Sequence, residues 1–236
     1  MQRYFSGDRE DSCFFLSQDD NYHIEKVMRM KIDDLIEIVD NKIVYLCKIV
    51  STNPVKAEIV HKLDEDNESK IKITLVQSLV NEQKMDYILQ KNTELGVYNF
   101  YGYKAFNSVI KENNKSDKKI IRWQRIVKEA SEQSKRNIIP SVDGIISIHE
   151  LIQIPADLKI LLTVNEKTNS LKKILQDNRD YDTMIMVVGP EGGFTMDEEK
   201  ILMSNGFQSA SLGKTVLRTE TAGVVALAMI NYEWMV

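Results

Sequence analysis

Two glycine-bearing stretches in the last third of the sequence hold the residues best suited to bind a small molecule. Residues 187–194 read Val-Val-Gly-Pro-Glu-Gly-Gly-Phe, and residues 212–222 read Leu-Gly-Lys-Thr-Val-Leu-Arg-Thr-Glu-Thr-Ala. Glycine tolerates left-handed backbone and lets a ligand approach main-chain N–H and C=O groups without a Cβ in the way. We therefore expect two main-chain loops that close on one ligand, although Gly-Pro-Glu-Gly-Gly alone is also compatible with a simple turn.

The chemistry of these stretches does not favour a phosphate ligand. Their glycines follow neither the GxGxxG nor the GxxxxGK[ST] spacing, and the acidic residues at 197–199 would repel a phosphate at the start of the next helix. Leu212, Val216 and Leu217 instead predict a pocket with apolar walls and main-chain hydrogen bonds. Such a pocket suits a flat aromatic base.

The elements around these stretches are typical of an α/β sheet. The apolar run 184–188 predicts a buried parallel strand, and Thr195 after it predicts a helix N-cap. Residues 209–212 predict a short strand, Gly213 a turn, and 222–235 an apolar helix. Ligands bind at the carboxyl ends of strands in open α/β sheets, which is where both stretches lie.

Strands and helices alternate along the chain from residue 71 onward, which favours a mainly parallel α/β sheet. In the helix 115–133 we expect Trp123 in the core, because a lone aromatic on a helix usually packs inward. The predicted elements are a strand at 71–78, a helix at 84–95 with Gly96 as its C-cap, a strand at 98–106, the helix 115–133, a strand at 159–164 and a short helix at 171–175.

The first part of the chain has a different pattern. Runs rich in β-branched residues at 35–40, 43–50 and 55–60 are separated by turn residues and predict short strands that close into a small barrel. The charged stretch 64–70 lacks apolar periodicity and reads as a linker. We therefore expect two domains, 1–68 and 69–236.

Positive charge is concentrated in the middle of the sequence. The net charge of −4 argues by itself against nucleic acid as a partner. Residues 69–140, however, carry fourteen Lys and Arg against seven Asp and Glu, a balance of +7, whereas 1–68 carry −6 and 141–236 carry −5. We expect the middle segment to contact an RNA backbone; a solvated charged face is the alternative.

Composition excludes several other classes of protein. No apolar run approaches the roughly 20 residues that span a bilayer, and the N-terminus has no signal-peptide core, so a cytoplasmic protein without a membrane partner is expected. Cys13 and Cys47 lack CxxC spacing, and the three histidines are scattered. We therefore expect neither a disulfide nor a metal site.

The motifs, taken together and in order, resemble a known family. They are Met-Gln-Arg-Tyr-Phe at 1–5, Lys-Asn-Thr-Glu-Leu-Gly-Val at 91–97, Arg-Trp at 122–123 with Glu-Ala-Ser-Glu-Gln-Ser-Lys-Arg at 129–136, and the two glycine stretches. This set resembles the SPOUT methyltransferases, and most of all their 16S ribosomal RNA (uridine-N3)-methyltransferase family. The resemblance covers nearly the whole chain.

The resemblance implies a fold and a reaction. It implies a PUA-like RNA-binding domain at 1–68 and a SPOUT domain at 69–236 with a deep trefoil knot that holds S-adenosylmethionine. Since threaded chains are rare, general rules would predict an unknotted sheet, and the knot rests on the resemblance alone. Methylation of uridine N3 in 16S ribosomal RNA or the small subunit is implied, as is a homodimer, which the apolar terminal helix also favours.

Candidate site residues follow from the loops and from the resemblance. Loss of the N3 proton is favoured by a carboxylate that accepts it, and Glu166 and Glu191 are the candidates. It is also favoured by a cation near the uracil oxygens, for which Arg218 is the candidate. For each of these residues, stabilisation of its own loop is the alternative role. We assign RNA contact to Arg3, Arg29, Lys84, Arg122, Arg125 and Arg136, with a surface ion pair as the alternative for Arg3 and Arg29. The predicted cofactor-binding residues are Thr163, Val164, Asn165, Gly189, Pro190, Glu191, Gly192, Gly193, Ser211, Leu212, Gly213, Val216 and Leu217.

One position departs from the family pattern. The family usually has an arginine before the serine of a strand-ending Arg-Ser pair, whereas this chain reads Phe-Asn-Ser at 106–108. An RNA or substrate contact is therefore lost at Asn107, or moved to Lys104 or Lys111. Two other functions stay open: a SPOUT relative that methylates another RNA position, such as a ribose 2′-hydroxyl, and an RNA-binding assembly factor without catalysis.

Overall fold

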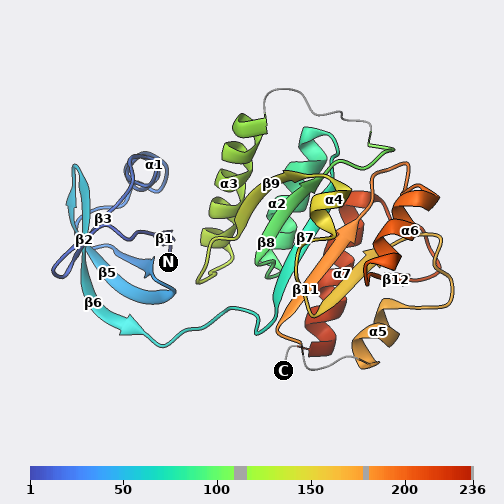
Figure 1. Cartoon of the computed structure of the whole chain (residues 1–236). Coiled ribbons are helices and arrows are strands. Elements are labelled where there is room, and N and C mark those ends of the chain that lie inside the picture. The colour runs from blue at the N-terminus through green and yellow to red at the C-terminus, as the bar shows by residue number, and fades with distance from the viewer. Residues whose placement is uncertain (109–115, 178–180, 235–236) are drawn as a thin grey trace. The chain divides into compact units, whose positions relative to one another are not determined.

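The computed structural model describes residues 1–108, 116–177 and 181–234, and it divides into two compact units (Figure 1). The first unit comprises Met1–Glu68 together with Ser131–Ile138, and the second comprises Ser69–Ala130 and the chain from Ile139 onward. The boundary predicted from the sequence did not include residues 131–138 in the first unit.

The first unit is built on a curled six-stranded sheet with the order β1-β4-β5-β6-β3-β2. Strand β1 pairs parallel with β4, and the other pairs are antiparallel. The sequence predicted β4 to β6 and missed the two- and three-residue strands β1 to β3. The strands are β1 (Arg3–Phe5), β2 (Arg9–Glu10), β3 (Cys13–Phe15), β4 (Leu35–Asp40), β5 (Ile43–Thr52) and β6 (Val55–Leu63).

One face of this sheet is covered by a short helix α1 (Gln18–Tyr22), capped by the Ser17 hydroxyl, and by the wider π-helical turn η1 (His23–Val27) that continues it. Ile24 of η1 is fully buried, and the Tyr4 hydroxyl lies 3.0 Å from His23 Nδ1. The hydrogen bonds leave β1 and β2 as sheet edges, so the predicted barrel is only partly closed.

The second unit is a parallel sheet with the strand order β12-β10-β11-β7-β8-β9. Every pair of neighbouring strands is parallel, as the alternation of strands and helices predicted. The sequence missed β9. The strands are β7 (Lys72–Ser78), β8 (Asn99–Tyr103), β9 (Ser141–Ile146), β10 (Leu158–Leu162), β11 (Thr183–Val188) and β12 (Gln208–Ala210).

Helices cover both faces of this sheet (Figure 1). In β11, Met184 and Met186 pack toward α2, α5 and α7, whereas Ile185 and Val187 pack toward α4 and α6. Burial on both faces explains why the strand is a continuous apolar run. The helices are α2 (Glu82–Glu94), α3 (Ser116–Gln133), α4 (Ile148–Leu151), α5 (Leu171–Asp177), α6 (Met196–Ser204) and α7 (Thr219–Trp234).

Trp123 of α3 is buried in this core, as expected. Helix α7 begins at Thr219, three residues before the predicted start, and its predicted end at residue 235 lies outside the described residues. Within the described ranges, no helix combines the length and hydropathy needed to cross a membrane. No group of three or more His, Cys, Asp or Glu side chains there could hold a metal ion.

Candidate active site

Three loops meet where the central strands of the second unit end. The last residues of β10 and β11 are in register, Leu162 opposite Val188, and Leu162 also lies opposite Ala210 at the end of β12. The loops that follow therefore start side by side at the carboxyl edge of the sheet, the usual place for a ligand. They are residues 163–166, 189–193 and 211–217, which we call loops A, B and C.

The three loops line two adjoining pockets, which we describe as the two lobes of one hollow because Leu162, Val164, Val216 and Leu217 line both. The lobe beside loop B has a volume of about 520 Å³, which is in the usual size range of small-molecule sites, and the lobe under loop C is a narrower extension of about 70 Å³. All the predicted cofactor-binding residues line this hollow: Thr163, Val164, Asn165, Gly189, Pro190, Glu191, Gly192, Gly193, Ser211, Leu212, Gly213, Val216 and Leu217.

The positions of Gly189, Gly193 and Gly213 in loops B and C require glycine for different reasons. A Cβ on Gly189 would lie 2.9 Å from the buried ring of Phe194. Gly193 and Gly213 have positive φ angles of 70° and 138°, which other residues rarely adopt. These three glycines therefore set the shape of the cavity wall through packing and backbone conformation.

Main-chain polar groups of loop C face the cavity without protein partners. Across the part of the chain that the structure describes, no hydrogen bond joins the N–H groups of Leu212, Val216 or Leu217 to another protein group. Ordered main-chain donors of this kind are rarely left unpaired unless water or a ligand satisfies them. Loop C thus combines an apolar lining with main-chain donors.

The start of α6 (Met196–Ser204) anchors loop A. The hydroxyl of Thr163 and the amide of Asn165 both donate to Glu199 Oε1, the latter at 3.0 Å. Glu199 lies in the acidic first turn of α6, which sequence reasoning used only to exclude a phosphate. Its carboxylate has a structural task, because it holds one wall of the cavity.

Loops B and C are joined by Thr219, the first residue of α7. Its hydroxyl donates to the carbonyl of Gly189 at 2.6 Å and accepts from the Gln77 amide at 3.0 Å. Thr219 and Gln77 are both buried. Sequence reasoning named neither residue for the site, and the only signal was the position of Thr219 at a helix start.

Of the three candidate catalytic residues, Arg218 is the best placed. Its side chain is exposed and lines the cavity between loops B and C. No carboxylate among the described residues lies within ion-pair distance of its guanidinium. The charge of Arg218 is therefore free to act on a ligand.

Glu191 also lines the cavity, but Lys84 neutralises it. Lys84 Nζ lies 2.8 Å from Glu191 and 3.4 Å from Glu220. Burial would raise the pKa of Glu191, but the hydrogen bond and charge of Lys84 outweigh burial and lower it. The Glu191 hydrogen bond, more than any other contact, raises the pKa of Lys84. Lys84 thus contributes to the charge of the cavity wall, and its contact with RNA stays a prediction.

Glu166 stabilises its own loop and does not line the cavity. It accepts hydrogen bonds from the Ser209 hydroxyl at 2.6 Å, from the Thr168 N–H and hydroxyl, and from the Asn169 N–H. These bonds, that of Ser209 first, lower its pKa to about 2. A carboxyl group with so low a pKa is a poor proton acceptor. Stabilisation of its own loop is therefore a better assignment for Glu166 than a catalytic role.

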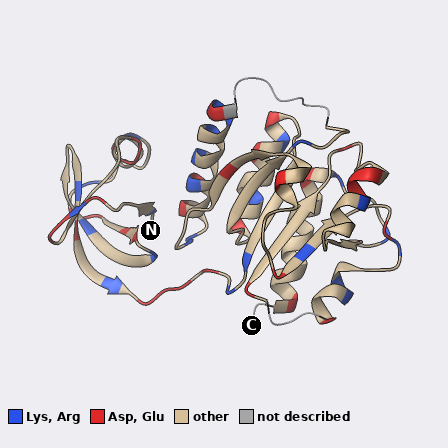
Figure 2. Ribbon diagram, viewed as in Figure 1, with Lys and Arg blue, Asp and Glu red and all other residues tan. Residues whose placement is uncertain are grey.

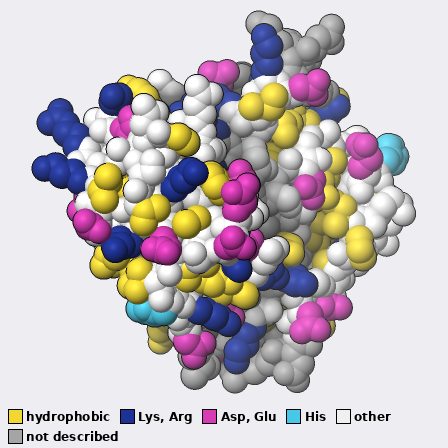
Figure 3. Space-filling view, turned by 90° about the vertical axis from the view of Figure 1, so that its left-hand side faces the viewer, with side chains coloured by type: hydrophobic (Ala, Val, Ile, Leu, Met, Phe, Trp, Pro, Cys, Tyr) yellow, Lys and Arg dark blue, Asp and Glu magenta, His cyan; other side chains and the backbone are white. Residues whose placement is uncertain are grey.

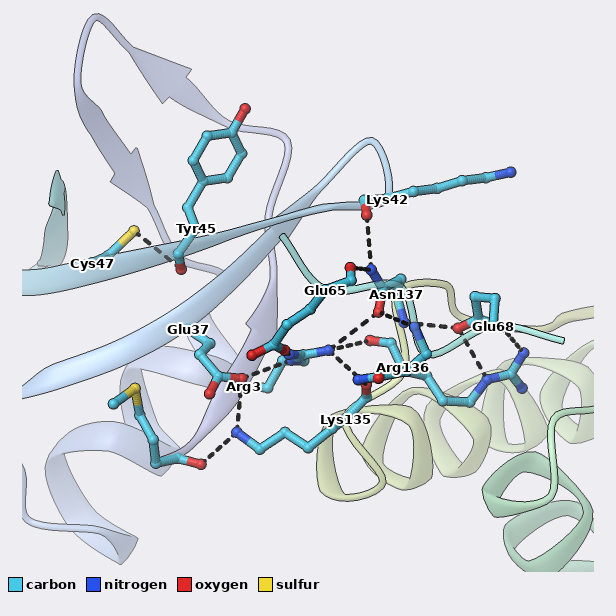
Figure 4. Close-up of polar contacts among 12 residues, drawn as sticks. Arg3, Glu37, Lys42, Tyr45, Cys47, Glu65, Glu68, Lys135, Arg136 and Asn137 are labelled. Carbon is cyan, nitrogen blue, oxygen red and sulfur yellow. Dashed lines mark hydrogen bonds and ion pairs between the residues drawn. The ribbon is translucent and has the colours of Figure 1, made fainter. Parts of the chain in front are cut away.

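Arg3 and Arg136 are buried, which corrects their assignment to RNA (Figure 4). The Arg3 guanidinium donates to Glu37 at 2.8 Å and to Glu65 at 2.7 Å, and it also contacts the carbonyl of Lys135. Arg136 is paired with Glu68. Both arginines form the interior of the first unit, where a phosphate has no access.

Arg29, Arg122 and Arg125 are exposed, as RNA contact requires. Arg125 pairs with Glu129, one turn along α3, and Arg122 pairs with Asp86 and Glu82. Figure 2 shows basic positions, interspersed with acidic ones, along α3. On the face seen in Figure 3, Lys and Arg are mixed with Asp, Glu and hydrophobic side chains, in line with the acidic total of residues 1–68.

Asn107 contacts the cavity wall, where the sequence suggested only a lost contact. Its amide donates to the carbonyls of Gly192 and Gly193 at 3.3 and 3.1 Å. Lys104 is exposed, and its Nζ is not among the groups that line the cavity. Lys111, the other alternative, lies outside the described residues.

The chain thus combines a parallel α/β domain, which contains the cleft, with a second, smaller β-domain. The family model described as RNA methyltransferase domain matches residues 67–231, and the one described as RNA methyltransferase PUA domain matches 19–60. The chain therefore belongs to the RNA methyltransferase family, of the SPOUT class that its motifs resemble.

Relatives and solved structures agree with this family. The chain is 32% identical to ribosomal RNA small subunit methyltransferase E of Bacillus subtilis, over 99% of this chain and 97% of that one. It is 31% identical to the protein of the same name from Mesomycoplasma hyopneumoniae, over 96% and 97%. The crystal structure of the Neisseria gonorrhoeae methyltransferase of that name, bound to S-adenosyl methionine, is similar with a TM-score of 0.89 and 32% identity, over 99% and 98%.

Proposed function

We propose that this chain uses S-adenosylmethionine to methylate N3 of a uridine in the 16S ribosomal RNA of the small ribosomal subunit. The observation that carries the proposal is the convergence of loops A, B and C on one hollow. The S-adenosyl methionine bound by the similar Neisseria gonorrhoeae protein supports the same ligand here. The names of the curated relatives support the substrate.

The cavity fits the proposed cofactor. Adenine is flat and apolar on its faces and carries polar atoms at its edge, and loop C offers apolar side chains with the unpaired N–H groups of Leu212, Val216 and Leu217. Lys84 with Glu191 and Glu220 carries a net charge of −1 beside loop B, which does not repel a positively charged sulfonium. A bound S-adenosylmethionine supplies an activated methyl group that needs no metal.

The loops contribute to the reaction by positioning and by excluding water. In-line displacement requires donor and acceptor to be held a few ångströms apart, and fixed geometry of this kind is a large part of catalysis. Gly189, which accepts from Thr219, and Thr163, which donates to Glu199, are tied to buried elements on opposite sides of the hollow. The walls are therefore preorganised before a substrate arrives.

Arg218 is proposed to favour loss of the uracil N3 proton. As that proton leaves, negative charge spreads to the uracil oxygens, and a nearby guanidinium stabilises it. Arg218 lines the cavity and has a free charge, whereas Glu191 is committed to Lys84. We therefore assign Arg218 the electrostatic role and no longer propose Glu166 as the base.

The RNA side of the site is proposed to include Arg29, Arg122 and Arg125, which are exposed. Since N3 lies on the Watson–Crick edge, the target uridine must be unpaired or flipped out of its helix. Phosphate contacts by these arginines would position the RNA without reading its sequence.

The assembly and location of the protein are also proposals. A homodimer is supported by α7, where Val224 and Val225 are partly exposed and the Tyr232 side chain is 89% exposed. The trefoil knot is supported by the family and by the contact of Thr219 with Gly189 across loops B and C. A cytoplasmic location is supported by the ribosomal RNA named as substrate of the relatives.

The test is methyl transfer by the purified protein to small subunits, and to free 16S ribosomal RNA, from a strain that lacks the enzyme. Mass mapping should find one methylated uridine with the methyl group on N3. A ribose 2′-O-methyl product would show that the chain is a SPOUT enzyme that methylates another RNA position. The absence of any methylated product would favour an RNA-binding assembly factor without catalysis.

An Arg218→Ala variant in the same assay should lower kcat by about 10²- to 10³-fold, the usual effect of removing one such charge. Its affinity for S-adenosylmethionine should change little. Lys200→Ala is the control, because Lys200 is an exposed cation on α6 that does not line the cavity. Unchanged turnover in Arg218→Ala would refute the role of Arg218.

A further inference from the structure

The segment that follows β8 (Asn99–Tyr103) reaches the cavity wall from outside the three loops. Asn107 lies in this segment, and its Nδ2 atom is 3.3 Å from the Gly192 carbonyl and 3.1 Å from the Gly193 carbonyl. An amide nitrogen carries two hydrogens, so it can donate one to each of two acceptors. The side chain thus bridges two successive carbonyls of loop B.

We propose that Asn107 is a positioning residue for loop B, which it holds in the shape that binds S-adenosylmethionine by donating to the Gly192 and Gly193 carbonyls. The inference rests on the proposed function, since it concerns the same cavity. It assigns a task to the one position where this chain departs from the family pattern.

Packing supports the same assignment. A Cβ on Gly192 would lie 3.0 Å from Asn107 Cβ, so the two residues are in close contact and Gly192 is small because Asn107 occupies the space beside it. Gly193 then has a φ of 70°. Without a donor between them, two neighbouring carbonyl oxygens directed to one point would repel each other.

The segment that carries Asn107 is itself held from the protein interior. The buried carboxylate of Glu198 accepts from the Phe106 N–H at 3.0 Å and from the Tyr103 hydroxyl at 2.8 Å. Its other oxygen caps α6 by accepting from the Thr195 N–H. Asn107 is therefore fixed to the same buried anchor as the helix that follows loop B, and it can position the loop.

Two substitutions separate hydrogen bonding from packing. Asn107→Ala removes the donor and should weaken S-adenosylmethionine binding about 3- to 10-fold, the usual size of one or two hydrogen bonds. Asn107→Asp keeps the shape but presents a carboxylate to two carbonyl oxygens. It should therefore bind the cofactor more weakly than Asn107→Ala does.

The measurement is isothermal titration with S-adenosylmethionine on the full chain, together with thermal unfolding and the KM for RNA. Asn205→Ala is the matched control, because the exposed Asn205 amide donates to the Ile201 carbonyl at 2.8 Å, away from loop B. The inference predicts weaker cofactor binding for both Asn107 variants, with the KM for RNA unchanged and unfolding temperatures close to that of the control.

Cofactor binding equal to that of the unaltered chain in both Asn107 variants would overturn the inference. So would normal binding by Asn107→Asp alone, since that result would mean that only packing matters. Failure of the unaltered chain to bind S-adenosylmethionine would be a failure of the proposed function, which is a different and recognisable outcome.

Discussion

At the scale of single residues, the glycines of the cleft show how different constraints produce one motif. Gly189 faces the Phe194 ring, Gly192 faces Asn107, and Gly193 and Gly213 have left-handed backbone. The sequence allowed us to predict that these positions shape a ligand site. It could not indicate which neighbour each glycine faces, because Phe194 and Asn107 approach through tertiary structure.

Gly189→Ala tests the packing constraint. The new Cβ would lie 2.9 Å from the Phe194 ring, and such overpacking typically costs about 1–3 kcal/mol. The free energy of unfolding, measured with urea, should fall by that amount, and cofactor affinity should fall with it. Gly7→Ala is the control, because its Cβ would make only an ordinary contact at 3.8 Å. Replacing the ring by leucine in Gly189→Ala/Phe194→Leu should restore part of the lost free energy of unfolding. If the second substitution restores none of it, the packing explanation is contradicted.

Glu166 gives a pH dependence whose sign can be stated. Its pKa is lowered from about 4.5 to about 2 in the folded chain, chiefly by the Ser209 hydroxyl. The folded state therefore gains stability from ionised Glu166 above about pH 4.5 and loses it as the pH falls toward 2. Glu166→Gln should flatten this part of the stability profile. Identical acid profiles for the variant and the unaltered chain would show that these hydrogen bonds contribute nothing.

At the scale of secondary-structure elements, burial decided what could be predicted. Strands β10 and β11 are covered on both faces and appear in the sequence as mainly apolar runs. Strands β1 to β3 have only two or three residues each, too few to show alternation. They exist because longer neighbours pair with them, which is a tertiary effect.

Helix α6 is the element that organises the site. Its first turn contains Glu198, which caps the helix with Thr195 and holds the segment before Asn107, and Glu199, which holds loop A. The sequence predicted the cap and the acidic turn. It did not reveal that these carboxylates bond to segments about 35 and 90 residues away in the chain.

Glu198→Gln tests this organisation. The amide would turn one acceptor oxygen into a donor, which leaves either the Tyr103 hydroxyl and the Phe106 N–H or the Thr195 N–H without a partner. The cost should be about 1–3 kcal/mol in the free energy of unfolding. Glu150→Gln is the matched control, since Glu150 is the equivalent residue of the exposed capping box of α4. Equal losses in the two variants would show that Glu198 does no more than cap its helix.

At the scale of the whole molecule, residues 131–138 are the feature that the sequence did not disclose. They begin within the last turn of the long helix α3 and continue beyond it, yet they complete the first unit: the Lys135 carbonyl and the Asn137 side chain accept from Arg3. The charges of these residues predicted a surface that binds RNA. For Arg3 and Arg136 this prediction is wrong, because both side chains are buried and pair with acidic residues more than 30 positions away in the sequence.

Arg3→Ala should destabilise the first unit. Removing the charge leaves the buried Glu37 and the partly exposed Glu65 without this partner, and breaking a buried pair such as Arg3–Glu37 costs about 3 kcal/mol. Lys135 still pairs with Glu37, so the loss should not exceed that figure. Urea unfolding of the full chain measures the change, with the exposed Arg29→Ala as the control. Normal stability together with weakened RNA binding in Arg3→Ala would favour the original assignment to RNA.

The claim on which the account depends is that loops A, B and C form a cleft for S-adenosylmethionine. Isothermal titration of the purified full-length chain with this compound tests it directly. The account predicts saturable binding in the micromolar range that is strongly weakened in Gly189→Ala. No measurable binding by the unaltered chain, or equal binding by that variant, would contradict it.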